Sequence, residues 1–163
     1  MKTNPKSLGN TWEREFCRDL SLWWTDGKDN KVFWRTDSSG AVKGVSELAG
    51  DVKAIKEIGF PLINNVIIEL KRTKQKDIFL DLIRRKEHSM IGEWWTKLEI
   101  EAAQWKRELL LVIKMVNRQS TVCLYSGGWF TNLSTCNLIY DNDCMVMLWE
   151  DFKKEAKWLE EKK

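Results

Sequence analysis

A near-continuous apolar run at residues 109–116 (LLLVIKMV) constrains the fold of this chain more than any other feature. A strand that is apolar on both of its alternating faces is typical of a sheet covered by helices on both sides. Residues 65–71 (NVIIELK) give a second clear strand pattern, dense in branched apolar side chains. The sequence therefore predicts an α/β fold in which helices flank a mixed central β-sheet.

Helical periodicity surrounds these strands. Apolar side chains recur every four residues over residues 10–24 and every three or four residues over residues 93–108, which predicts a helix in each segment. Asn10 followed by Glu13 resembles a capping box at the start of the first helix. Shorter helices are expected at residues 77–87 and from residue 150, further strands at residues 31–36, 51–55, 121–125, 137–140 and 144–149, and a connection at residues 59–61.

The length and composition describe one globular domain. The chain has 163 residues, of which 43% are hydrophobic and 31% charged, so we expect a single domain over residues 1–163 and no membrane segment. The N-terminal residues are polar and no apolar leader follows them, so we expect a cytoplasmic protein. The net charge of +3 is too small to identify a partner by itself.

The sequence disfavours two common chemistries. Its four cysteines form no CxxC pair and its only histidine is His88, so neither a zinc cluster nor a Ser-His or Cys-His mechanism is expected. His88 follows a charged run and is expected on the surface. Most of the ten tryptophans are expected in the core, and a minority could stack on bases.

Two charges emerge on one face of the strand predicted at residues 65–71. Because side chains alternate along a strand, Glu69 and Lys71 point to the same side as Ile67. Burying these charges is costly unless they pair, bind a metal or line a cleft. The alternative is that the strand ends there and both side chains reach solvent.

A second carboxylate stands at the start of the preceding predicted strand. If the two strands are neighbours, Asp51 and Glu69 could share one cation, with the Leu70 carbonyl as a third ligand. Hard oxygen ligands of this kind suit Mg²⁺, which keeps several of its waters. Lys71 would lie beside the metal, where the cation lowers and the carboxylates raise its pKa.

This arrangement resembles a nuclease signature. Asp51 followed by Glu69-Leu70-Lys71 is similar to the D…(D/E)xK motif of the PD-(D/E)xK nuclease superfamily. Gly9 with Glu13-Arg14-Glu15 resembles the G-x-x-x-E-R-E opening of archaeal-type Holliday junction resolvases, and Arg35 followed by Ser38-Ser39-Gly40 resembles their Arg and G-S-G loop. The resemblance covers residues 9–74 and departs from the family at Gly50, where those enzymes usually have proline.

The resemblance implies a restriction-endonuclease-like core and a role for each matching residue. Asp51 and Glu69 would bind the metal, Lys71 would be the catalytic lysine, and Glu13 would complete the acidic cluster unless it only caps the helix. The implied metal is Mg²⁺, with Mn²⁺ as a possible substitute, and no small-molecule cofactor. The residues implied to contact DNA are Arg14, Arg35, Ser38, Ser39, Lys43, Arg72 and Lys74.

The expected function is metal-dependent, structure-selective DNA cleavage of the Holliday junction resolvase type. The expected substrate is branched DNA. Because symmetric cleavage of a junction needs two active sites, we expect a homodimer. The expected setting is the cytoplasm of a phage-infected cell. Three alternatives stay open: another nuclease of the superfamily that acts on duplex or flap DNA, a non-catalytic nucleic-acid-binding module, and a protein without a nucleic-acid role.

Overall fold

The fold is known from a computed structural model. It describes residues 5–36, 49–75, 78, 80, 89–116, 120–126, 138–140 and 144–156, with the side chains of residues 5–10 and 138–140 excepted. Most of the helix predicted at residues 77–87 lies outside these ranges, and so does His88.

A five-stranded mixed sheet forms the centre of the molecule, with the strand order β3-β4-β5-β7-β6. Strands β3 and β4 run parallel, and every other neighbouring pair is antiparallel. Parallel neighbours require a long crossover connection, which here contains helix α4. The mixed α/β sheet predicted from the sequence is thus confirmed. The strands are β3 (Val66–Thr73), β4 (Glu108–Met115), β5 (Ser120–Ser126), β6 (Leu138–Tyr140) and β7 (Cys144–Leu148).

Two short antiparallel strands form a separate ladder beside β3. They are β1 (Phe33–Arg35) and β2 (Val52–Ala54). A 3₁₀ turn, η1 (Glu57–Gly59), and a short helix, α2 (Phe60–Asn65), then lead into β3. Residues 59–61 lie in the connection between β2 and β3, as predicted, and Pro61 stands in the first turn of α2, where a missing backbone N–H costs nothing.

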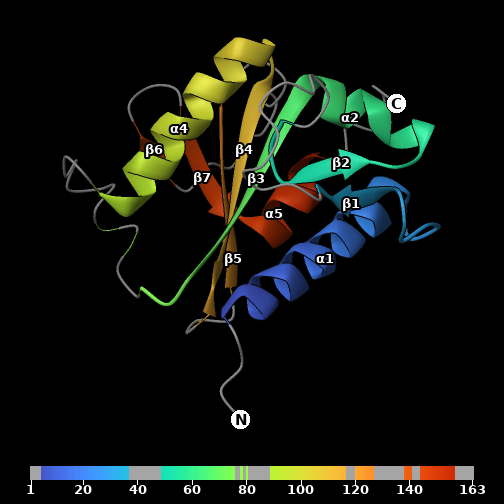
Figure 1. Cartoon of the computed structure of the whole chain (residues 1–163), viewed down its shortest axis with the longest axis horizontal. Coiled ribbons are helices and arrows are strands. Elements are labelled where there is room, and N and C mark those ends of the chain that lie inside the picture. Colours follow the sequence, from blue (N-terminus) through green and yellow to red (C-terminus); the bar gives the residue numbers. More distant parts are fainter. Residues whose placement is uncertain are drawn as a thin grey trace.

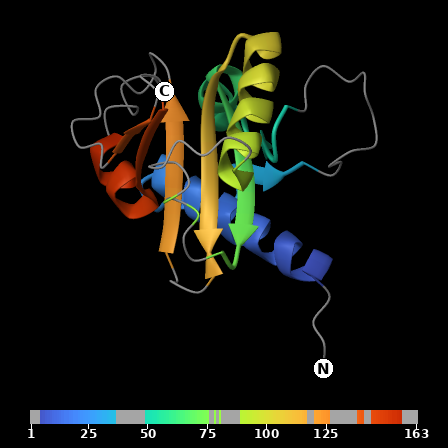
Figure 2. The same cartoon turned by 90° about the vertical axis from the view of Figure 1, so that its left-hand side faces the viewer.

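Helices cover both faces of the sheet, as Figures 1 and 2 show. Helix α1 (Pro5–Trp24) and helix α5 (Trp149–Glu155) share one hydrophobic core with one face. Helix α4 (Met90–Trp105) packs on the other face. Helix α1 begins five residues before the predicted start at Asn10, with Pro5 as its first residue. The predicted capping box is therefore wrong, since Asn10 lies inside the helix.

The alternation of β3 between these two cores positions the polar end of the strand. Val66, Ile68 and Leu70 belong to the core with α1, whereas Ile67 belongs to the core with α4. Glu69 and Lys71 have the parity of Ile67, so they project toward α4. The predicted facing of this strand is confirmed.

The C-terminal helix completes the core on the α1 side. The indole Nε1 of Trp149 donates a hydrogen bond to Asp19 Oδ2 at 2.6 Å, and Lys153 Nζ lies 3.0 Å from the same oxygen. The indole of Trp23 in turn donates to the Lys153 carbonyl at 2.9 Å. These contacts tie α5 to α1. None of the helices in the described ranges combines the length and apolarity that crossing a membrane requires.

Candidate active site

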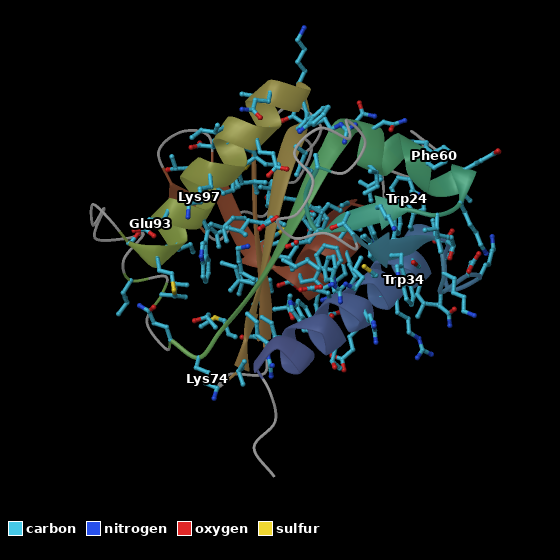
Figure 3. All side chains as sticks on the ribbon, viewed as in Figure 1. Trp24, Trp34, Phe60, Lys74, Glu93 and Lys97 are labelled. Atoms are coloured by element: carbon cyan, nitrogen blue, oxygen red, sulfur yellow. The ribbon has the colours of Figure 1, made fainter. Side chains whose placement is uncertain are left out.

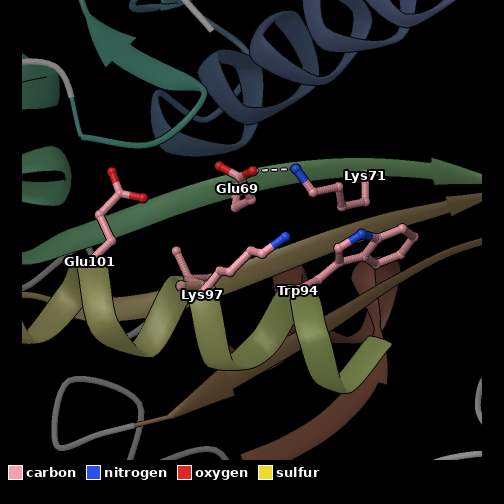
Figure 4. Close-up of a pocket in the computed structure, with 6 residues that line it drawn as sticks. Glu69, Lys71, Trp94, Lys97 and Glu101 are labelled. Carbon is pink, nitrogen blue, oxygen red and sulfur yellow. Dashed lines mark hydrogen bonds and ion pairs between the residues drawn. The ribbon is translucent and has the colours of Figure 1, made fainter. Parts of the chain in front are cut away.

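Glu69 and Lys71 form an ion pair at the edge of a pocket between β3 and α4. Their charged groups are in direct contact, and the side chains are 21% and 29% exposed. The pocket has a volume of about 190 Å³. Figure 4 shows that it lies over the α4 side of β3. Its lining consists of Glu69, Lys71, Trp94, Lys97, Leu98 and Glu101.

Asp51 is fixed against β3 from two directions. Its backbone N–H donates to the Ile68 carbonyl at 2.9 Å, and its side-chain Oδ2 accepts a hydrogen bond from the Leu70 N–H at 2.8 Å. On its other side, its carbonyl accepts from the Thr36 N–H at 2.9 Å. The two separated parts of the motif therefore meet through these hydrogen bonds, although β2 itself pairs with β1.

The Leu70 carbonyl faces the same edge as the Asp51 carboxylate. In an extended strand the N–H and C=O of one residue project to the same side, and the Leu70 N–H points at Asp51. Two carboxylates and a carbonyl fit Mg²⁺, which binds proteins through one or two carboxylates and keeps several waters. Among the described residues, no three His, Cys, Asp or Glu side chains lie close enough together to hold a metal ion.

The electrostatics of Glu69 also fit a cation site. Burial raises the pKa of Glu69 from 4.5 to about 7, and the negative charge of Asp51 contributes to the rise, while Lys71 lowers it. Burial is the largest cause of the rise, so the site disfavours the ionised carboxylate even with Lys71 beside it. A bound divalent cation would favour the ionised carboxylate.

Glu13 lies on α1 and forms an ion pair with Arg35. Arg35 Nε is 3.3 Å from Glu13 Oε2, an ion-pair distance without hydrogen-bond geometry. Both side chains lie near the buried thiol of Cys17, whose pKa is raised to about 12 by burial and then by Glu13 and Asp51. Glu13 is thus within electrostatic reach of the Asp51 side of the site. Its catalytic role stays a prediction.

The residues predicted to contact DNA are distributed unevenly. Arg14 is exposed on α1, and Arg72 and Lys74 are exposed at the end of β3, where Figure 3 labels Lys74. Arg35 is mostly buried in its pair with Glu13. Ser38, Ser39 and Lys43 lie outside the described residues. Arg72 and Lys74 thus follow Lys71 closely in sequence, while the alternation of β3 turns the Arg72 side chain to the face opposite Lys71.

Helix α4 contributes side chains to the site that the sequence patterns did not identify. Trp94, Lys97 and Glu101 line the pocket opposite Glu69 and Lys71. Helical spacing places position 101 on the same stripe as Trp94 and Leu98. A charged residue on that otherwise apolar stripe was the available signal for a role at the site.

The backbone conformation at position 50 explains why this chain has glycine before Asp51, where the enzymes that it resembles usually have proline. Its φ is +75°, which the proline ring forbids. A Cβ at this position would meet the Ile68 carbonyl oxygen at 2.7 Å and the Ile67 side chain at 2.9 Å. Only glycine lets the chain turn this close to β3 and deliver Asp51 to the Leu70 amide.

In a comparison with family models, the model described as "Phage putative PDDEXK endonuclease" matches residues 4–160. The match includes the part after residue 92, where the sequence showed no detailed resemblance. No curated protein and no solved structure matches the chain.

Proposed function

Because the chain belongs to the phage PDDEXK endonuclease family, we propose that it is a metal-dependent, structure-selective DNA endonuclease of the Holliday junction resolvase type. One observation carries the proposal. The Asp51 carboxylate is hydrogen-bonded to the Leu70 amide, between Glu69 and Lys71 in the strand sequence. Folding thus brings the Asp51 carboxylate to a residue 19 positions away, between the two charged residues of the motif, and this contact supports the proposal.

The proposed metal ligands are Asp51, Glu69 and the Leu70 carbonyl, with Mg²⁺ as the metal and Mn²⁺ as a substitute. The chemistry that a bound divalent cation supplies is polarisation of a phosphoryl oxygen and a lowered pKa for the attacking water. The thiol of Cys17 is no rival nucleophile, since it is buried and its pKa is raised to about 12.

Lys71 supplies fixed positive charge at the same place. Its ammonium lies against the Glu69 carboxylate and lines the pocket, so it can approach a phosphate seated beside Glu69. An ammonium at that position stabilises the charge that develops on the phosphoryl oxygens during in-line attack. Glu69 holds the lysine in place before the substrate arrives.

The proposed substrate is branched DNA held by its backbone. Arg72 and Lys74 are exposed at the end of β3, close to Lys71 in sequence, and Arg14 is exposed on α1. Contacts from such residues to phosphates give affinity without reading bases. The resemblance of Glu13-Arg14-Glu15 to junction resolvases supports a four-way junction as the substrate and a homodimer as the acting form. The proposed setting is the cytoplasm of a phage-infected cell.

A cleavage panel with Mg²⁺ tests this function. The substrates are a four-way junction, a flap, a linear duplex and a single strand of matched length, each incubated with wild type and with Lys71→Ala. We expect paired nicks in the junction, and a loss of at least about 100-fold in Lys71→Ala, as for removal of one transition-state donor. Preferred cleavage of duplex or flap DNA would identify another nuclease activity of the superfamily. Binding without cleavage of any substrate would overturn the proposal.

A further inference from the structure

A long-range hydrogen bond joins helix α4 to the residue before Asp51. The backbone N–H of Gly50 donates to Glu101 Oε1 at 3.0 Å, across 51 positions of sequence. A hydrogen bond to a carboxylate is about twice as strong as one between neutral groups. Figure 4 shows the Glu101 side chain extending from α4 toward β3. The contact therefore links the helix that forms one wall of the pocket to the segment that delivers Asp51.

The Gly50 segment needs such a link because its backbone conformation is unusual. At φ +75° and in close approach to Ile68, it turns sharply just before the Asp51 N–H reaches the Ile68 carbonyl. Thr36 supports the same segment from the other side, since its Oγ1 donates to the Gly50 carbonyl at 3.0 Å. Glu101 satisfies the Gly50 amide, so both polar backbone groups of Gly50 have partners.

We propose that Glu101 is a positioning residue that fixes Gly50 and thereby holds the Asp51 carboxylate at the Leu70 amide beside Glu69. The inference deepens the proposed function and rests on it for its effect on cleavage. The claim about Gly50 itself does not need any catalytic activity. Glu101 acts through the backbone, and its carboxylate oxygen is the group that matters.

A neighbouring carboxylate on the same helix gives a matched control. Glu99 is exposed and accepts a hydrogen bond from the Trp95 indole at 2.8 Å, within α4. It does not line the pocket. Glu99→Ala therefore removes one carboxylate from α4 without touching the Gly50 amide.

The experiment compares Glu101→Ala, Glu101→Gln and Glu99→Ala with wild type. The first readout is hydrogen exchange of the Gly50 amide in metal-free protein, followed by NMR. We expect exchange to be at least about 10-fold faster in Glu101→Ala, as for loss of a protecting hydrogen bond. Glu101→Gln keeps the acceptor oxygen, so its Gly50 amide stays protected, as in Glu99→Ala.

The second readout is single-turnover cleavage of a four-way junction with Mg²⁺. Because small misplacements of a reacting group can cost about 100-fold, we expect a loss of roughly 10- to 100-fold in Glu101→Ala. We expect Glu101→Gln to restore most of the rate and Glu99→Ala to leave it unchanged.

Either readout can overturn the proposal. Unchanged Gly50 exchange in Glu101→Ala would show that Glu101 does not hold this segment. Equal losses of cleavage in the Gln and Ala variants, with Gly50 still protected in Gln, would show that the charge acts directly and not through positioning. If wild type cleaves no DNA, the proposed function fails, and the exchange result alone decides whether Glu101 holds Gly50.

Discussion

The Leu70 amide donates a hydrogen bond to Asp51 Oδ2 at 2.8 Å, which places an acid from the β2 segment beside the polar end of β3. The bond fixes the carboxylate at the strand edge toward which the Leu70 carbonyl also points. Glu69 and Lys71, on either side of Leu70 in sequence, project toward α4. The site therefore lies where an edge of the central sheet meets the pocket on its α4 face.

The backbone conformation before Asp51 gives a prediction about stability. We expect Gly50→Ala to lower the free energy of unfolding by more than the roughly 1–2 kcal/mol of left-handed strain in an L-residue, because the new Cβ would also meet the Ile68 carbonyl at 2.7 Å. Gly27→Ala is the control, since Gly27 has φ +80° but a Cβ there would meet no atom within 4 Å. Urea denaturation of both variants measures the difference, and equal losses would contradict the close approach of Gly50 to β3.

The raised pKa of Glu69 predicts how stability depends on pH. Its carboxyl titrates near pH 7 in the folded protein and near 4.5 when unfolded. Between these values the folded state holds the extra proton, so its stability falls as pH rises, and the penalty is complete above about pH 7. Glu69→Gln does not titrate. We therefore expect the variant to gain stability relative to wild type between about pH 5 and pH 8, measured by denaturation in EDTA.

Metal provides the control for the pH prediction. Mg²⁺ bound at the proposed site would require the ionised Glu69 and stabilise it, so saturating Mg²⁺ should raise the stability of wild type at pH 8 and leave Glu69→Gln nearly unaffected. If the stability difference between wild type and Glu69→Gln were the same at pH 5 as at pH 8, that result would contradict the assigned environment of Glu69.

Contacts of Asp19 predict a purely structural effect at the opposite side of the fold. Asp19→Ala removes the acceptor of the Trp149 indole and the partner of Lys153. We expect a loss of about 1–3 kcal/mol in the free energy of unfolding, as for a hydrogen-bonded group left without its partner. Cleavage per folded molecule should match wild type at 25 °C. Reduced cleavage by fully folded Asp19→Ala protein would show that the α1–α5 contact also shapes the active site.

Exposed basic residues at the end of β3 predict the salt dependence of DNA binding. We expect Arg72→Ala to weaken binding and to reduce the slope of log affinity against log salt by about 1, as for the loss of one phosphate contact. The control is Lys154→Ala, an exposed lysine of α5, which packs on β5 and β7. Fluorescence anisotropy at several salt concentrations measures both slopes. Identical slopes for the Arg72 variant and wild type would exclude this phosphate contact.

The sequence was informative wherever the hydrophobic pattern was strong. The apolar run at residues 109–116 corresponds to β4, which is buried on both faces. The alternation in NVIIELK predicted that Glu69 and Lys71 lie on the same face of the strand as Ile67. A shift of one residue would move every side chain to the other face, so the pattern fits a single register. The proximity of Asp51 to this strand followed from the motif, and the structure adds the hydrogen bonds that hold it.

Other features depended on contacts between distant segments. The bond from Gly50 to Glu101 joins residues 51 positions apart, and no local pattern encodes it. Helix α2 is too short to show helical periodicity, and a proline in so short a segment is also typical of a loop. The predicted start of α1 was too late because Asn10 resembles a cap, while the preceding turn carries little apolar signal.

The most direct test of the proposed activity is cleavage of a four-way junction by Asp51→Asn in the presence of Mg²⁺. Asparagine keeps a side-chain oxygen that can accept from the Leu70 amide but removes the negative charge that a cation needs. We expect the circular dichroism spectrum of wild type and a loss of at least about 1000-fold in single-turnover rate, within the range that enzymes gain from positioned charge and metal. Cleavage by Asp51→Asn at the wild-type rate would contradict the assignment of Asp51 and Glu69 as the metal site.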